Sequence, residues 1–183
     1  VDLDGDDKFL VFEGVDSCFY LLVNGQFVGY TQISHKMSEF NITKYLVQGE
    51  NVIDVIVLKW CASSYLEDQD KWRFTGIFRD VYLLSRSKER VNDYVITTEI
   101  SGKLNFKILS GNNATVTFNG ESKLAKVNEE ISFYVDNPEL WSAEIPNLYD
   151  LTITCGNEVI LEQVGFRECK ITDGVLRLMI IKK

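Results

Sequence analysis

The stretch that decides the fold class runs Cys18-Phe19-Tyr20-Leu21-Leu22-Val23-Asn24-Gly25-Gln26-Phe27-Val28-Gly29-Tyr30. Two apolar runs, residues 18–23 and 26–30, flank the dipeptide Asn24-Gly25. A two-residue hairpin turn of type I′ needs positive φ at both central residues, and Asn-Gly meets this need. The stretch therefore predicts two antiparallel β-strands joined by a tight turn.

More strands are predicted on both sides of this hairpin. Apolar runs cover residues 9–12, 51–58 and 77–84, and short runs of this kind are typical of strands. Residues 38–46 predict only a helical turn or a bent loop, with Ser38 and Asn41 as candidate caps. No segment carries a sustained helical period of apolar residues. The sequence therefore predicts an all-β protein.

A polar and charged segment, residues 85–90, predicts a domain boundary. Beyond it, short strands are expected at regular spacing, at residues 93–99, 104–109, 114–118, 131–135, 148–154 and 159–164. This number and spacing of strands indicates an immunoglobulin-like β-sandwich. The Cys…Trp…Cys arrangement of antibody domains is absent, so only the architecture is implied.

Length and charge exclude several classes of protein. The chain has 183 residues and a net charge of −8 at pH 7. The length is enough for one large or two small domains with hydrophobic cores. The charge argues against nucleic-acid binding, because phosphate neutralisation needs clustered Lys and Arg. No apolar run approaches the roughly 20 residues that span a bilayer, and residues 1–7 lack the features of a signal peptide, so no membrane association is expected.

The cysteines and the histidine limit the chemistry. Four cysteines (Cys18, Cys61, Cys155 and Cys169) show no C-x-x-C spacing. We expect them to be reduced, as in a cytoplasmic protein, with disulfides as the alternative. Cys18 and Cys155 lie in strand-like runs and are expected to pack as small core residues. His35 is the single histidine, which excludes a multi-histidine zinc site and argues against a Ser-His-Asp triad in this chain; we expect it on the surface.

The segment Ser64–Val81 carries a resemblance to a known family. It reads Ser-Tyr-Leu-Glu-Asp-Gln-Asp-Lys-Trp-Arg-Phe-Thr-Gly-Ile-Phe-Arg-Asp-Val and resembles a segment of the β-galactosidases of glycoside hydrolase family two. The run from Glu67 to Arg73 favours this branch over the glucuronidases and mannosidases. Other segments resemble the family in the same order, namely Phe12–Ser17, Asn24–Tyr30, Ser38–Thr43, Gly49–Asn51, Asn137–Ser142, Ile145–Tyr149 and Val164–Glu168.

The resemblance implies a domain arrangement. Residues 1–86 are expected to form a partial sugar-binding jelly-roll domain, and residues 87–172 an immunoglobulin-like β-sandwich. Residues 173–183 are expected to be the truncated start of a segment leading to a catalytic barrel. The family's first jelly-roll strands and its barrel lie outside this sequence, so we expect an N-terminal fragment of a longer bacterial enzyme.

The resemblance also implies a reaction. The whole enzyme would hydrolyse terminal β-D-galactosides such as lactose through a covalent galactosyl intermediate. Retaining glycosidases need two carboxylates about 5–5.5 Å apart, and the family places both glutamates on the barrel. No catalytic residue is therefore assigned to this chain, and the chain alone is predicted to be inactive.

Asp70 is the one residue to which the resemblance assigns a functional contact. It corresponds to a loop aspartate that reaches the sugar pocket and helps to hold a sodium ion. Carboxylate oxygens suit hard cations and accept hydrogen bonds from sugar hydroxyls. Sodium and magnesium are the implied cofactors of the whole enzyme, with the magnesium ligands outside this chain, and neither is expected to bind tightly to the fragment. The alternative role of Asp70 is to cap the turn before Trp72.

The other residues singled out in and near this segment have structural interpretations. Trp60 and Trp72 could stack on sugar rings, but burial against the sandwich is the commoner fate of a large aromatic residue, so we expect both in the core. Arg73 and Arg79 are expected to pair with nearby carboxylates. Gly76 is expected to adopt a backbone conformation closed to other residues.

Two other classes of function stay open. The chain is alternatively a stand-alone carbohydrate-binding or adhesion module without hydrolase activity, or a structural scaffold. The partners implied by the enzyme interpretation are a β-galactoside and the catalytic barrel domain. A homo-oligomer is also possible, because exposed jelly-roll edges can pair between chains.

Overall fold

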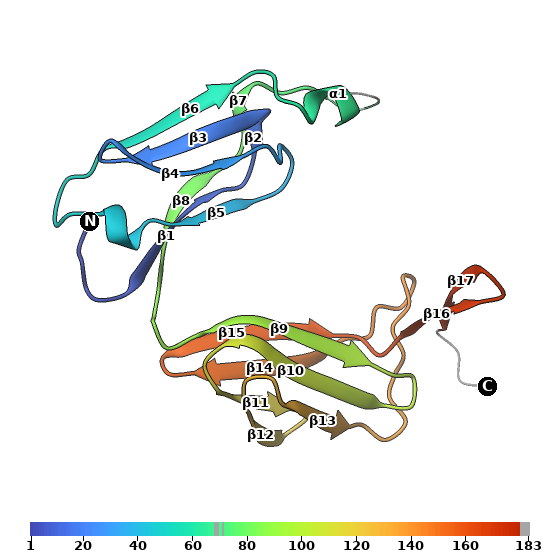
Figure 1. The fold of residues 1–183 in the computed structure, drawn as a ribbon. Coiled ribbons are helices and arrows are strands. Elements are labelled where there is room, and N and C mark those ends of the chain that lie inside the picture. Colours follow the sequence, from blue (N-terminus) through green and yellow to red (C-terminus); the bar gives the residue numbers. More distant parts are fainter. Residues whose placement is uncertain (68–69, 71, 180–183) are drawn as a thin grey trace. The chain divides into compact units, whose positions relative to one another are not determined.

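The structure, a computed structural model, describes residues 1–67, 70 and 72–179. Its regular structure is almost entirely β-strand, so the predicted all-β class is confirmed. The chain divides into two compact units, Val1–Lys88 (unit 1) and Glu89–Lys183 (unit 2). Figure 1 shows the strands of each unit arranged as facing sheets.

Unit 1 is a β-sandwich of two three-stranded sheets. One sheet has the strand order β5-β1-β8 and the other β4-β3-β6, while β2 and β7 form a separate short pair. All of these pairings are antiparallel. The strands are β1 (Asp7–Phe12), β2 (Val15–Asp16), β3 (Cys18–Val23), β4 (Gln26–Thr31), β5 (Ser38–Asn41), β6 (Ile53–Leu58), β7 (Gly76–Ile77) and β8 (Val81–Arg86), and the helical turns are η1 (Thr43–Tyr45) and α1 (Ser64–Glu67).

The core of unit 1 lies between the two sheets. Leu10 and Phe12 of β1 pack with Phe19 and Leu21 of β3 in one buried cluster. The ring centroids of Phe12 and Phe19 are 4.6 Å apart. Alternate side chains of a strand point to the same face, which explains why residues two positions apart are buried together. Each such side chain contributes about 1.5–3 kcal/mol of hydrophobic stabilisation.

The Asn24-Gly25 hairpin forms as predicted. β3 pairs with β4, and the turn residues have φ angles of 50° and 74°. The Asn24 side chain also ties the turn to the next segments of the chain. Its Nδ2 donates to Tyr45 O (2.9 Å) and Asn51 Oδ1 (2.8 Å), and its Oδ1 accepts from Val52 N (3.0 Å).

Replacing Asn24 by alanine is expected to lower the free energy of unfolding of unit 1 by about 2–3 kcal/mol. The substitution places a β-carbon in the left-handed region and removes three side-chain hydrogen bonds. Asn119 is a matched control, because it has a φ of 48° before Gly120 and no side-chain hydrogen bond to a described residue. Asn119→Ala should cost only about 1 kcal/mol in unit 2. Denaturant unfolding measures both, and equal losses would contradict the role of the Asn24 side chain.

The interpretation of residues 38–46 was partly wrong. The helical turn is present as η1, and Asn41 Oδ1 accepts a hydrogen bond from Thr43 N (3.1 Å). Ser38–Asn41, however, form the strand β5 and pair with β1. Tertiary packing decides this outcome, because the Phe40 ring lies 5.8 Å from that of Phe19, centroid to centroid, and occupies the space where Gly29 lacks a β-carbon.

The strand predicted at residues 77–84 is interrupted. β7 ends at Ile77 and β8 begins at Val81. The intervening residues carry the chain from its pairing with β2 to its pairing with β1. Phe78 N donates to Gly14 O (3.2 Å), and Glu13 N donates to Asp80 O (3.0 Å), which fixes this crossing on both sides.

Unit 2 is a second β-sandwich, with sheets of order β13-β10-β9 and β12-β11-β14-β15 and a separate hairpin β16-β17. Its core contains Phe106 from the first sheet and Phe118 and Leu151 from the second. Cys155 is buried in this core, and Cys18 is buried in unit 1, as predicted. The strands are β9 (Val91–Thr98), β10 (Lys103–Gly111), β11 (Ala114–Phe118), β12 (Glu121–Ala125), β13 (Glu130–Tyr134), β14 (Tyr149–Cys155), β15 (Glu158–Val164), β16 (Glu168–Thr172) and β17 (Val175–Met179).

Three strands of unit 2 are absent from the sequence-based prediction. β12 follows the Asn119-Gly120 turn and pairs with β11. β16 and β17 pair across Asp173 and Gly174, whose φ angles are 52° and 73°. Residues 175–179 are thus in a hairpin, and the assignment of residues 173–183 to a segment leading to a further domain stays a prediction.

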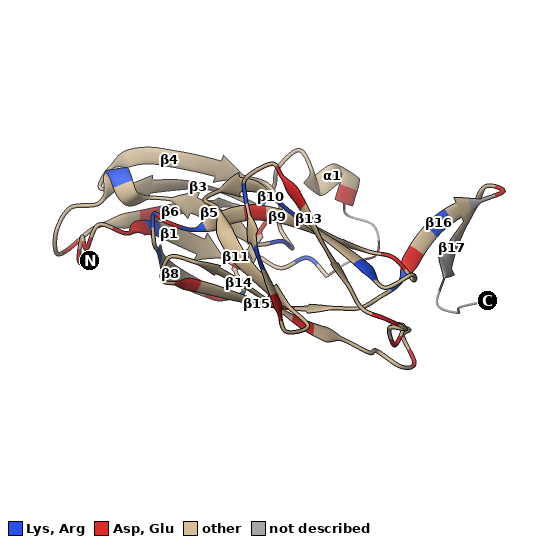
Figure 2. Ribbon diagram, turned by 90° about the horizontal axis from the view of Figure 1, so that it is seen from below, with Lys and Arg blue, Asp and Glu red and all other residues tan. Residues whose placement is uncertain are grey.

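Charged side chains are dispersed over the strands and loops of each unit, with both signs present (Figure 2). Lys8 is buried, and its Nζ donates to Asp4 Oδ1 (2.7 Å) and Ser85 Oγ (2.6 Å). The carboxylate therefore compensates the burial of this ammonium group. Within the described residues, no helix has the length and apolar character needed to cross a membrane.

Candidate functional site

The candidate site lies at one end of the unit 1 sandwich. It is formed by the loop after β4, the segment from β6 to α1, and residues 72–75 before β7. Figure 1 shows α1 beside the β2 and β7 end of this unit. The position of these loops follows from the strand pairing, because β3 pairs with both β4 and β6.

Asp70 is exposed, as a residue that contacts a ligand must be. Asp68, Gln69 and Lys71 lie outside the described residues. A single carboxylate supplies part of the oxygen coordination of a hard cation. Elsewhere in the part of the chain that the structure describes, no three His, Cys, Asp or Glu residues gather to hold a metal ion. Asp70 therefore fits as one sodium ligand among others, and its role stays a prediction.

A narrow polar pocket lies beneath α1, and it has no room for a water molecule. Asp16 is 2% exposed, and its Oδ2 has no hydrogen-bond partner among the described residues. The Ser17 hydroxyl lies 2.7 Å from Asp16 Oδ1 and 2.8 Å from Lys59 O. A hydroxyl has one proton and donates to one of these acceptors at a time. The pocket is lined by Asp16, Ser17, Ser34, Ser63, Ser64, Glu67 and Arg73.

A wider hollow of about 390 Å³ adjoins this pocket and shares Ser34 and Glu67 with it. Ile33, His35 and Lys36 complete its lining. This hollow is large enough for a small ligand and lies on the same loops as the segment that carries Asp70.

Hydroxyl groups surround the thiol of Cys61. Its Sγ lies 3.0 Å from Ser63 Oγ and 3.5 Å from Ser64 Oγ, and its backbone N donates to Ser64 Oγ (3.1 Å). Burial alone would raise the pKa of the Cys61 thiol, but the hydrogen bonds from Ser63 and Ser64 outweigh it and lower the pKa. The two hydroxyls therefore stabilise the Cys61 thiolate relative to the same thiol buried without them.

As the pH is raised, the rate of Cys61 alkylation is expected to increase. The pH at which this increase occurs should be lower in the wild type than in the Ser63→Ala/Ser64→Ala variant. A lowered pKa places the thiolate at lower pH, and removal of the two hydroxyls leaves burial as the dominant effect, which moves the profile to higher pH. The measurement is peptide-resolved alkylation with iodoacetamide across pH. Ser122→Ala in unit 2 is the matched control. An unchanged profile in the double variant would contradict the role of the hydroxyls.

The expected burial of two tryptophans was wrong. Trp60 is 53% exposed and Trp72 is 84% exposed. Trp60 lies two residues beyond the end of β6, where the sheet no longer covers it, and the Arg73 guanidinium packs 4.3 Å from its ring centroid. Trp72 lies in a loop beyond the sandwich.

His35 is half-buried, contrary to its predicted surface position. Its ring centroid lies 5.4 Å from that of Phe78 and 6.0 Å from that of Phe74, and these two phenylalanine rings stack on each other. Its Nε2 is buried and has no partner among the described residues. No signal in the sequence identifies this contact, because residues 35 and 78 meet only in the folded unit. Gly76 has a φ of 85°, as predicted.

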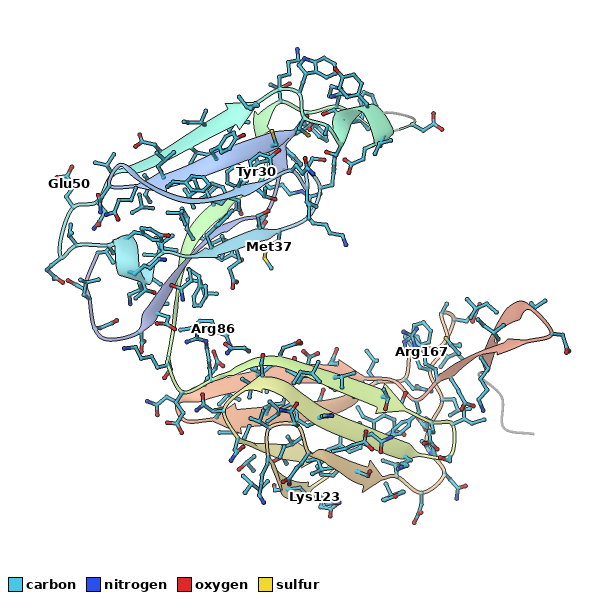
Figure 3. The ribbon with its side chains drawn as sticks, viewed as in Figure 1. Tyr30, Met37, Glu50, Arg86, Lys123 and Arg167 are labelled. Atoms are coloured by element: carbon cyan, nitrogen blue, oxygen red, sulfur yellow. The ribbon has the colours of Figure 1, made fainter. Side chains whose placement is uncertain are left out.

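Unit 2 contains a groove of about 330 Å³ beside β15. Trp141 lines it, and the Arg167 guanidinium lies 4.6 Å from the ring centroid of Trp141. Figure 3 labels Arg167 in unit 2. Gly165 is required here, because a β-carbon would lie 2.7 Å from Trp141 Cβ. Tyr149 packs into the core of unit 2, 5.2 Å from Phe166 between ring centroids.

The two sandwiches match two models of one protein family. Residues 3–87 match the model described as glycosyl hydrolases family 2, sugar binding domain. Residues 80–167 match the model described as glycosyl hydrolases family 2. Unit 1 is thus a jelly-roll β-sandwich and unit 2 an immunoglobulin-like β-sandwich, as predicted. The chain belongs to glycosyl hydrolase family 2.

Curated relatives are longer than this chain. The chain is 48% identical over 181 residues to a beta-galactosidase of Staphylococcus xylosus, covering 92% of this chain and 18% of that protein. It is 44% identical over 178 residues to a beta-galactosidase of Actinobacillus pleuropneumoniae, covering 91% of this chain and 18% of that protein. The chain therefore spans about a fifth of the length of these relatives.

Solved structures support the fold. A beta-glucuronidase of Lactobacillus rhamnosus matches with a TM-score of 0.77 at 22% identity, covering 95% of this chain and 35% of that one. A beta-glucuronidase of Ruminococcus gnavus matches with a TM-score of 0.77 at 18% identity, covering 96% and 34%. At these identities the likeness concerns the fold alone.

Proposed function

We propose that this chain forms the sugar-binding and immunoglobulin-like domains of a bacterial β-galactosidase that hydrolyses terminal β-D-galactosides such as lactose. The observation that carries the proposal is the 44–48% identity to proteins named beta-galactosidase over nine-tenths of the chain. The identity to the two beta-glucuronidase structures is 18–22%. The sequence therefore favours a galactoside over a glucuronide.

In this proposal the chain binds the sugar and does not break the bond. A retaining mechanism needs two carboxylates about 5–5.5 Å apart, one as nucleophile and one as general acid and base. Both would come from a catalytic barrel domain, the main partner of this chain. Asp70 would accept hydrogen bonds from a sugar hydroxyl and supply one oxygen ligand to sodium. Sodium would supply a fixed positive charge beside the sugar, and magnesium would be held by residues of the barrel.

The same proposal covers the location and the assembly of the whole protein. The whole protein would act in the cytoplasm, where the four free thiols stay reduced. A homo-oligomer would use contacts that include sheet edges, since β6 pairs with β3 alone among the described strands and β8 with β1 alone. An unpaired edge presents backbone donors and acceptors to another strand.

The test is a chimera in which this chain replaces the matching region of the Staphylococcus xylosus protein. The chimera is expected to hydrolyse a chromogenic β-galactoside, while this chain alone and the S. xylosus protein without the region are expected to be inactive. A chromogenic β-glucuronide serves as the substrate control. A folded chimera without galactoside hydrolysis, or activity in the isolated chain, would overturn the proposal.

The exposed rings of Trp60 and Trp72 favour a second function, a carbohydrate-binding module that acts without a barrel. Exposed aromatic rings have an apolar face that can stack on a sugar ring. Titration of the isolated chain with galactose, followed by tryptophan fluorescence, tests it. Saturable binding that is lost in Trp72→Ala would support the module, and an unchanged spectrum would reject it.

A further inference from the structure

The start of β3 and the segment after β6 run side by side. Within the strands, Cys18 is paired with Leu58. The contact continues beyond the end of β6, because Ser17 N donates to Leu58 O (3.2 Å) and the Ser17 hydroxyl oxygen lies 2.8 Å from Lys59 O. The backbone of residues 59–61 therefore stays next to residues 17 and 18.

This arrangement brings two cysteines together in a reciprocal way. Cys18 Sγ lies 4.0 Å from Trp60 O, and Cys61 Sγ lies 3.8 Å from Ser17 O. Each thiol thus contacts the carbonyl group that immediately precedes the other cysteine. A carbonyl oxygen is about 3 Å from the next Cα in a trans peptide, so each sulfur lies within roughly 7 Å of the other residue's Cα. A disulfide joins two sulfur atoms about 2.05 Å apart, so closure of this pair requires the two side chains to turn toward each other.

The two thiols differ in their surroundings. Cys18 is 1% exposed, whereas Cys61 is half-buried at the surface loop. Burial raises the pKa of the Cys18 thiol, and the neighbouring Cys61 raises it further. The hydroxyls of Ser63 and Ser64 act in the opposite sense on Cys61. The pair therefore combines one half-buried thiol with a lowered pKa and one fully buried thiol, an arrangement typical of redox-sensitive cysteines.

We propose that Cys18 and Cys61 are a redox-active pair that closes to a disulfide when hydrogen peroxide oxidises the protein. The Cys61 thiolate attacks the peroxide, the O–O bond breaks, and Cys61 becomes a sulfenic acid as the leaving hydroxide takes a proton to form water. The Cys18 sulfur then attacks the sulfenic sulfur. The S–O bond breaks, the S–S bond forms, and the Cys18 proton leaves with the hydroxide as a second water. Two thiols are oxidised and one molecule of hydrogen peroxide is reduced.

The disulfide would fix the N-terminal start of the segment that carries α1 and Asp70. Ser64, the first residue of α1, lies three residues after Cys61. A cross-link to β3 would hold the start of this segment against the sandwich and reduce the conformational freedom of the loop that follows. An effect of oxidation on sugar contact by Asp70 rests on the proposed function, whereas formation of the disulfide does not.

The test is oxidation of the reduced 183-residue chain with one equivalent of hydrogen peroxide. Free thiols are then blocked with iodoacetamide, and the non-reduced peptides are mapped by mass spectrometry. The expected result is a peptide pair linked through Cys18 and Cys61, lighter by two hydrogen atoms, with Cys155 and Cys169 still alkylated. Dithiothreitol should return all four thiols. Oxidised protein in which Cys61 is a sulfinic acid, or is linked to Cys169 of another chain, would overturn the proposal.

Three variants sharpen this result. Cys61→Ser should remove the cross-link and leave Cys18 as a free thiol. Cys18→Ala, which keeps a small apolar side chain in the core, should trap Cys61 as a sulfenic acid that dimedone labels. Cys155→Ala is the matched control, a buried cysteine of unit 2, and should keep the Cys18–Cys61 link. Retention of the link in Cys61→Ser would contradict the assignment. The peptide map of the wild-type chain is made without any sugar. A failure of the redox proposal is therefore distinguishable from a failure of the galactosidase proposal.

Discussion

Phe118→Ala is expected to lower the free energy of unfolding of unit 2 by about 3–5 kcal/mol, the usual cost of truncating a buried phenylalanine. Phe118 is 1% exposed and lies at the centre of an aromatic group. Its ring centroid is 5.8 Å from Phe133, 6.2 Å from Tyr149 and 6.2 Å from Phe166. The substitution removes the transfer free energy of the ring and leaves a cavity that these rigid neighbours cannot fill.

Tyr134→Ala is the matched control for this prediction. Tyr134 lies next to Phe133 on β13 but is 66% exposed, so its loss should change stability by less than about 0.5 kcal/mol. Denaturant unfolding followed by a signal from unit 2 measures both variants. A similar loss in the two variants would show that the aromatic group around Phe118 does not stabilise the sandwich.

Asp70→Asn is expected to lower kcat/KM for a chromogenic β-galactoside by about 10- to 100-fold in the active chimera. Hydrogen bonds to a charged group contribute about 1.5–3 kcal/mol, and a tenfold loss of rate corresponds to about 1.4 kcal/mol. The amide keeps the shape of the side chain but loses the charge that sodium coordination needs. The wild-type chimera should also lose activity when potassium replaces sodium, and the variant should respond much less.

Glu50→Gln is the control for Asp70→Asn. Glu50 is an exposed carboxylate in the loop before β6, and Figure 3 shows it in unit 1 away from α1. Its neutralisation changes the net charge of the chain by the same amount and should leave kcat/KM unchanged. Equal losses in the two variants would indicate a general effect of charge, and no loss in Asp70→Asn would reject the sugar and sodium contact.

The sequence was sufficient where local chemistry determines the structure. The Asn24-Gly25 turn and the strands beside it follow from the φ angles that a two-residue turn requires, and these are satisfied by residues adjacent in the chain. The positive φ of Gly76 was predictable for the same reason. The immunoglobulin-like sandwich followed from the spacing of apolar runs, although β12, with Glu121 and Lys123, is too polar to be identified in that way.

The candidate site was less predictable because it depends on contacts between distant residues. Nothing near residue 40 in the sequence shows that Phe40 packs over Gly29, yet this contact accompanies β5. The exposure of Trp60 depends on where β6 ends, and the partial burial of His35 depends on Phe74 and Phe78. The neighbourhood of Cys18 and Cys61 likewise arises from the pairing of β3 with β6. The resemblance to a family identified Asp70 but none of these contacts.

The pairing of β1 with β8 has a consequence for synthesis on the ribosome. Asp7 of β1 is opposite Arg86 of β8, so β1 cannot complete its sheet until nearly all of unit 1 has been translated. At about 5–20 residues per second, that delay is on the order of 4–16 s. Throughout it, Leu10 and Phe12 remain without part of their final packing, whereas the β9–β10 hairpin of unit 2 closes between neighbouring segments. We therefore expect nascent unit 1, more than unit 2, to engage chaperones during translation.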